Sequence, residues 1–140
     1  MRIKLPIQLV KLEENNFHLV ITSEFIGGKK GNWVIDTGAS RTVFDVTRKE
    51  DYILLGEEDE IHSAGITDQP IVTSLAELKS FQIGKLNVSG LKAAVIDFSH
   101  INLLYLKAGG PEICGLIGSD FLIKYNAVVD YRKKILELSV

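Results

Sequence analysis

The stretch Trp33-Val34-Ile35-Asp36-Thr37-Gly38-Ala39-Ser40 places a carboxylate directly after a run of large apolar residues. Such a run is typical of a buried strand, and Gly38 favours a tight turn after it because glycine has no Cβ. Asp36 is therefore expected on a tight loop close to the core. An ordinary Asp turn after a strand would give the same tripeptide, so Asp-Thr-Gly alone decides little.

A second stretch, Gly115-Leu116-Ile117-Gly118-Ser119-Asp120-Phe121-Leu122, repeats this pattern late in the chain. Two large apolar residues precede the loop glycine, Gly118, and small polar residues follow it. Two loops of this kind, packed against each other, would hold Asp36 in place. An apolar strand that runs into the start of a helix would show the same pattern.

Elsewhere, apolar and polar residues alternate with a period of two, which is typical of half-buried strands. Turn residues separate these segments at short intervals, so the sequence predicts an all-β barrel or sandwich in a single domain over residues 1–140. Pro6 cannot donate to a ladder, which places the first strand at a sheet edge or a subunit boundary.

Helical signals are few. Ser119 to Tyr125 is the stronger candidate, with Ser119 as the N-cap and Asn126 as its end. A shorter candidate covers Leu103 to Lys107. The segment after Asn126 alternates, turns and alternates again, which predicts a closing hairpin.

Composition excludes several functions. The 16 Lys and Arg residues are outnumbered by 18 Asp and Glu residues, which argues against nucleic acid as a partner. The single cysteine, Cys114, lies in an apolar run, where it is expected to be a small buried hydrophobe. With no second cysteine and only three histidines, no metal site is expected. No apolar stretch approaches the length of a membrane span, and the N-terminus lacks the apolar run of a signal peptide. The expected location is the cytoplasm.

Three segments, taken in order, resemble those of the retropepsin-like aspartic proteases, which are the retroviral proteases and their cellular and bacterial relatives. The first is Val34 to Ser40, and the third is Gly115 to Leu122. Between them, Ser63-Ala64-Gly65-Ile66 is similar to the tip of a flap, although a simple surface hairpin would show the same pattern. The resemblance implies an acid-protease closed barrel with one short C-terminal helix, functional as a symmetric homodimer.

The resemblance also implies roles for individual residues. Asp36 would be the catalytic carboxylate, Thr37 would hydrogen-bond across the dimer axis, and Gly38 would offer backbone contacts to a bound peptide. The residues expected to support the active-site loop are Thr37, Gly38, Ala39, Ser40, Leu116, Ile117 and Gly118. No metal and no cofactor would be required.

One Asp36 per chain implies two chains. Hydrolysis by this chemistry needs two adjacent carboxylates that share a proton, and only Asp36 has the Asp-Thr-Gly context. The function expected is an aspartic endopeptidase in which Asp36 and its symmetry mate activate water against an extended peptide or protein.

Two alternatives stay open. One is a catalytically silent dimeric peptide- or protein-binding module of the same fold, and the other is an unrelated β domain in which Asp36 is a turn residue.

Overall fold

The computed structural model describes the backbone of residues 1–61 and 71–140 and the side chains of residues 1–56 and 74–140. Strands dominate it, so the all-β class is confirmed. The strands are β1 (Arg2–Pro6), β2 (Gln8–Glu13), β3 (Asn16–Phe25), β4 (Lys30–Ile35), β5 (Val43–Asp45), β6 (Tyr52–Ile61), β7 (Ile71–Leu78), β8 (Phe81–Ile83), β9 (Leu86–Val88), β10 (Lys92–Ile96), β11 (Ile113–Ile117), β12 (Val128–Asp130) and β13 (Ile135–Ser139). The helices are α1 (Ser99–Lys107) and α2 (Ser119–Lys124), with single 3-10 turns η1 (Ile26–Gly28) and η2 (Lys49–Asp51).

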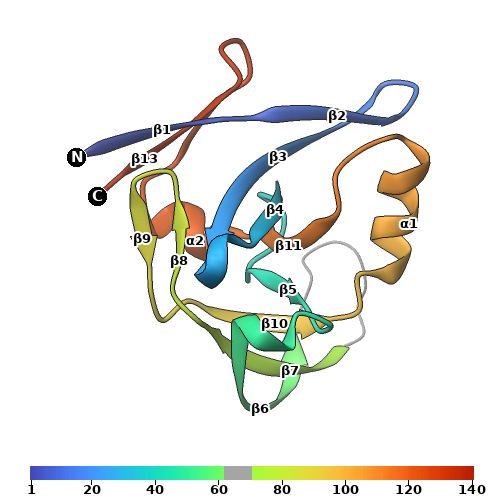
Figure 1. The fold of residues 1–140 in the computed structure, drawn as a ribbon, viewed down its shortest axis with the longest axis vertical. Helices are drawn as coiled ribbons and strands as arrows, with labels where there is room; N and C mark the ends of the chain where they lie inside the picture. The colour runs from blue at the N-terminus through green and yellow to red at the C-terminus, as the bar shows by residue number, and fades with distance from the viewer. Residues whose placement is uncertain (62–70) are drawn as a thin grey trace.

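One large sheet curls around the core in the order β6-β7-β10-β5-β11-β4-β3-β8-β9, and β2 adds to β3 (Figure 1). β4 and β11 lie next to each other near the middle of this sheet and run parallel. Both strands are therefore flanked on each side, and their residues are buried apart from the exposed Lys30 and the half-buried Asn32 and Leu116. The middle of the sheet is thus the rigid part from which the two glycine loops emerge.

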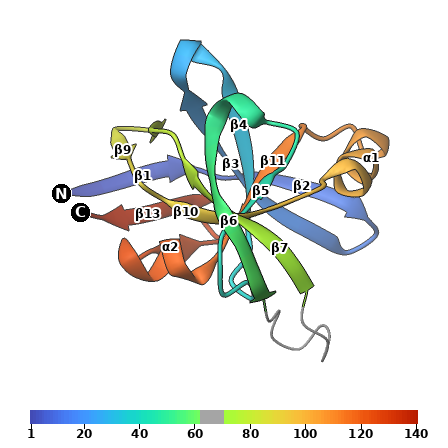
Figure 2. The same ribbon diagram turned by 90° about the horizontal axis from the view of Figure 1, so that it is seen from below.

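A small second sheet, in the order β1-β13-β12, joins the two ends of the chain. β1 pairs antiparallel with β13, and the first and last residues exchange backbone hydrogen bonds. The two termini consequently lie side by side, as Figure 2 shows. β1 forms one edge of this sheet, as Pro6 predicts, and β12 with β13 forms the predicted closing hairpin.

An aromatic cluster fills the core behind β4. Trp33 is 0% exposed, and its ring packs on Phe44 and Phe81 at centroid separations of 5.4 and 5.6 Å. A buried indole needs a partner for its N–H. Trp33 Nε1 donates to Ser23 Oγ at 2.8 Å, and that hydroxyl donates in turn to the Gly31 carbonyl. The strand that leads to Asp36 is therefore fixed by packing and by a satisfied polar contact.

Both helices differ in detail from the prediction. Ser119 is the first residue of α2 and Gly118 is its N-cap, because Gly118 has extended backbone angles and the Ser119 N–H already donates to the Ala39 carbonyl. α1 begins four residues earlier than the predicted Leu103. Asp97 accepts hydrogen bonds from the Ser99 N–H and hydroxyl, which support this earlier start and lower the pKa of the exposed Asp97 carboxyl.

Candidate active site

The two glycine loops leave the sheet side by side because their strands are parallel neighbours in register. Val34 pairs with Leu116 and Ile35 pairs with Ile117, so both chains reach the same end of the sheet together. The Asp36 N–H then donates to the Ile117 carbonyl at 2.9 Å. The packing of one loop against the other, which the repeated sequence pattern predicts, is what the structure shows.

The Asp36 loop is closed by its own hydrogen bonds. The Gly38 N–H donates to Asp36 Oδ1 at 3.1 Å, and the Ala39 N–H donates to the Asp36 carbonyl at 3.2 Å. No described residue donates to the second carboxylate oxygen, Oδ2. Asp36 is half-buried, so its carboxylate is held on one side and open on the other.

The second loop closes on the first through Gly118. The Ser119 N–H donates to the Ala39 carbonyl at 2.7 Å, which brings the two backbones into contact. A Cβ on Gly118 would lie 2.7 Å from the Arg41 carbonyl carbon and 2.9 Å from the Ala39 oxygen, both backbone atoms. Only glycine fits at this position, because any side chain would displace the loop that carries Asp36.

Thr42 and Asp120 join the two loops from behind. Both Asp120 carboxylate oxygens accept from the Thr42 N–H at 3.0 Å, and Oδ1 also accepts from the Thr42 hydroxyl at 2.8 Å. The same hydroxyl accepts from the Gly118 N–H at 3.1 Å. Asp120 lies in the first turn of α2, as the sequence predicts, but its contacts with Thr42 are a connection that sequence reasoning missed.

Replacement of Thr42 by Val is expected to lower the free energy of unfolding by about 1–3 kcal/mol. Thr42 is fully buried, and valine keeps its shape while it leaves the buried Gly118 N–H without an acceptor. Urea denaturation measures the change. Thr22→Val is the matched control, since Thr22 donates to Asn32 at the exposed surface, and its loss is expected to stay within about 0.5 kcal/mol. Equal losses in the two variants would contradict the role of Thr42.

Comparison with known proteins identifies the family. The sequence matches the family model described as "Aspartyl protease" over residues 24–121, which includes both glycine loops. This chain belongs to the aspartyl protease family. A solved structure of a retropepsin-like aspartic protease from Rickettsia conorii superposes with a TM-score of 0.53 at 19% sequence identity, covering 99% of this chain and 89% of that one. The chain therefore has the retropepsin-like fold. No curated protein sequence matches it.

The remaining predicted site residues fall into three groups. Thr37 and Gly38 are exposed at the tip of the Asp36 loop, and the Thr37 hydroxyl has no hydrogen-bond partner among the described residues. Ala39 is half-buried and Ser40 is exposed beside them. The predicted flap tip, 63–66, lies outside the described residues, although β6 and β7 on either side of it pair antiparallel.

A pocket of about 620 Å³ opens beside Asp36. The lining residues come from β3, β4, β11, α1 and the segment around β12, and they are Phe17, His18, Leu19, Val34, Ile35, Asp36, Thr37, Ile101, Tyr105, Leu116, Val129 and Tyr131. Phe17, near the start of β3, is 51% exposed. Leu116 lines the pocket rather than only supporting the loop from behind.

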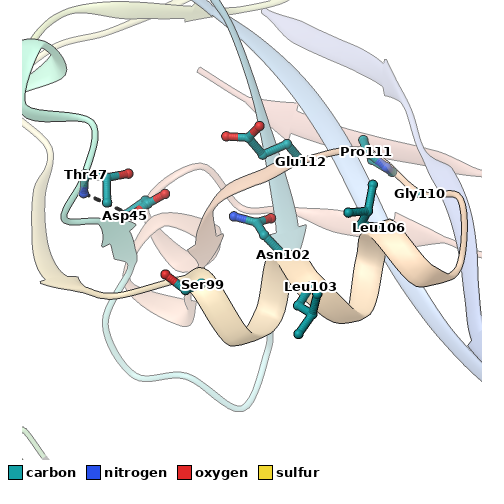
Figure 3. Close-up of a pocket in the computed structure, with 9 residues that line it drawn as sticks. All are labelled: Asp45, Thr47, Ser99, Asn102, Leu103, Leu106, Gly110, Pro111 and Glu112. Carbon is teal, nitrogen blue, oxygen red and sulfur yellow. Dashed lines mark hydrogen bonds between the residues drawn. The ribbon is translucent and has the colours of Figure 1, made fainter.

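Helix α1 separates this pocket from a second one. Ile101 and Tyr105, four residues apart, line the pocket beside Asp36. The opposite side of the helix lines a pocket of about 400 Å³ with Asp45 and Glu112, and none of its lining residues is shared with the first (Figure 3). The segment between β10 and β11 thus forms a wall of the candidate active site, and Asn102 fixes it there through two hydrogen bonds to the Ile113 backbone.

Cys114 is buried, and burial raises the pKa of its thiol, as expected for a small core hydrophobe. Within the described part of the chain, no three His, Cys, Asp or Glu side chains gather to hold a metal ion. No helix in that same part is long and apolar enough to span a membrane.

Proposed function

We propose that the chain is an aspartic endopeptidase whose active site forms between two copies, with Asp36 of each copy supplying one carboxylate. The observation that carries this proposal is the open, half-buried Asp36 carboxylate on a loop fixed by Ile117 and Gly118, beside a largely apolar pocket. One carboxylate of the pair takes a proton from water while the other, protonated, polarises the scissile carbonyl. Family membership supports the reaction class.

The tip of the Asp36 loop supports a site shared between two chains. Among the described residues, a Cβ on Gly38 would meet only Asp36 Oδ1, at an ordinary 3.5 Å, so none of them requires glycine there. A requirement for glycine at position 38 would arise from the close approach of a second chain's loop or of a bound peptide. The exposed hydroxyl of Thr37 is available for the same contact.

The β12 edge supports the same arrangement. β12 is the outer strand of the small sheet, where β13 is its strand neighbour within the described residues. Val129 on β12 lines the pocket beside Asp36, and the nearby Val128 and Tyr131 are exposed apolar residues. An open strand edge next to exposed apolar groups is a template for strand pairing. Antiparallel pairing with β12 of a second copy about a twofold axis would extend the sheet and close the site.

The direct test of the proposal is cleavage of a mixed library of unstructured peptides by the purified protein, with the cut positions identified by mass spectrometry. A backbone-to-backbone mode of binding predicts that extended segments are cut and folded domains are not. Dimerisation is measured on the same sample by sedimentation equilibrium.

Mixing subunits tests whether the site is shared. With a threefold excess of the Asp36→Asn variant and free subunit exchange, activity per wild-type chain is expected to fall to about one quarter, because most wild-type chains then face a partner without a carboxylate. The control replaces the variant with the same mass of wild-type protein, which leaves activity per chain unchanged. Unaltered activity in the first mixture, with exchange verified, would mean that one chain suffices.

A further inference from the structure

The pocket beside Asp36 is apolar except at a few points. Val34, Ile101 and Leu116 contribute apolar walls from three different elements, and among the described residues no Lys, Arg or Glu lines it. Asp36 belongs to the proposed chemistry. Thr37 and Tyr131 are exposed at the pocket lining, and the less exposed polar pair is His18 on β3 and Tyr105 on α1, whose Nδ1 and hydroxyl oxygen are 2.6 Å apart.

The hydrogen bond between these two residues has one favoured direction. Tyr105 is 2% exposed, and no described residue other than His18 accepts a hydrogen bond from its hydroxyl. If His18 Nδ1 carried the proton, the Tyr105 O–H would be buried without an acceptor, which costs about 1–3 kcal/mol. Burial also raises the pKa of Tyr105 to about 12, so the hydroxyl keeps its proton. Tyr105 therefore donates, and Nδ1 of neutral His18 accepts.

This direction determines what the pocket offers to a ligand. A neutral imidazole carries one proton, so acceptance at Nδ1 places the hydrogen on Nε2. His18 is half-buried and lines the pocket, and no described residue accepts from Nε2. The wall thus presents the Nε2–H of His18 as a donor among apolar side chains, in addition to the exposed hydroxyls of Thr37 and Tyr131 that also line the pocket.

We propose that His18 is a specificity-determining residue, which donates its Nε2–H to an acceptor at the end of a large, uncharged side chain of the bound peptide. Tyr105 is the positioning residue that fixes the His18 tautomer. This inference rests on the proposed function for the identity of the ligand as a peptide. An apolar body is required by the walls, and a carboxylate end would lose its hydration at a large cost because no Lys or Arg lines the pocket among the described residues. Tyrosine and glutamine meet these conditions, whereas phenylalanine and methionine have similar shapes without the acceptor.

The tautomer is measured without any enzymatic activity. Long-range ¹⁵N–¹H correlation spectra at a pH where His18 is neutral are expected to show a bare Nδ1 and a protonated Nε2. In Tyr105→Phe, which removes only the hydroxyl, the two nitrogens are expected to approach the mixed pattern of a free imidazole. A protonated Nδ1 in the wild type would overturn the inference, whether or not the protein cuts peptides.

Specificity is measured with two matched pairs of peptides, Tyr against Phe and Gln against Met at the position that this pocket selects. The wild type is expected to prefer Tyr and Gln by about tenfold in kcat/KM. His18→Leu is expected to reduce both ratios to near one, and His18→Gln, which keeps an N–H donor, to restore part of them. Cleavage with ratios near one in the wild type, or ratios unchanged in His18→Leu, would overturn the inference while the proposed function stands.

The absence of cleavage separates the two proposals. If the wild type cuts no peptide, the proposed function fails, and the inference is then decided by binding. The His18 Nε2–H resonance is expected to shift on addition of the Tyr peptide and to shift less with the Phe peptide. Equal responses to the two peptides would contradict donation to an acceptor.

Discussion

Replacement of Asp36 by Asn is expected to lower peptide hydrolysis by about 10³-fold or more, without loss of folding stability. Asparagine has the same shape, and its oxygen can still accept from the Gly38 N–H that closes the loop at 3.1 Å. Under the proposed function, asparagine can neither ionise nor carry the shared proton, so the pair of carboxylates would lose both of its roles. The measurement combines cleavage of the peptide library with urea denaturation of both proteins.

Asp97→Asn is the matched control for this experiment. Asp97 likewise accepts from a backbone N–H two residues ahead, that of Ser99 at 2.8 Å, but it is exposed and lines neither pocket. Its replacement is expected to leave cleavage unchanged. Equal cutting by the wild type and Asp36→Asn would remove Asp36 from the mechanism. No cutting by either protein, in a sample shown to be dimeric, would favour the catalytically silent binding module.

Replacement of Gly118 by Ala is the second change expected to have a large effect. The new Cβ would lie within 3.0 Å of backbone atoms of Ala39 and Arg41, and backbone cannot rotate away as a side chain can. We expect a loss of about 1–3 kcal/mol in the free energy of unfolding, together with a loss of hydrolysis because the Asp36 loop moves. Denaturation and cleavage assays measure the two effects on the same preparation.

Gly38→Ala is the matched control within the same pair of loops. Its Cβ has an ordinary contact at 3.5 Å and its backbone angles are open to any residue, so the stability of the single chain is expected to stay within about 0.5 kcal/mol. Under the proposed function, Gly38→Ala still impairs dimerisation or peptide binding. A Gly118→Ala variant as stable and as active as the wild type would show that the contact between the two loops is not required.

Local sequence patterns were sufficient to predict the strands, the end of helix α2 and the family. The alternation of apolar and polar residues predicts the strands, Asn126 ends helix α2 with a φ of 46°, and the order of the two glycine loops identifies the family. Each of these features depends on residues close together in the chain, where the period of the pattern and the backbone preference of a single residue decide the structure. Asp36 was found in the same way, because the residues around it form one continuous motif.

Local patterns could not predict the contacts between segments that are distant in the sequence. Thr42 and Asp120 are 78 positions apart, and His18 and Tyr105 are 87 apart, so no local period relates them. Asp120 was noted as a first-turn residue of α2, but its partner follows only from the parallel pairing of β4 with β11. The position of α1, which forms one wall of the pocket beside Asp36, depends in the same way on a distant contact, because the segment after β10 packs against β11.

The sequence by itself determined the strand content, the family and the loop that carries the single candidate carboxylate, because those are encoded by neighbouring residues. Only the tertiary structure decided what surrounds that carboxylate. The parallel register of β4 and β11 brings the loops together, and the antiparallel pairing of β1 with β13 leaves β12 as an open edge beside the pocket. Register and edge position arise from pairing between remote strands, and a pattern along one strand does not specify its neighbour.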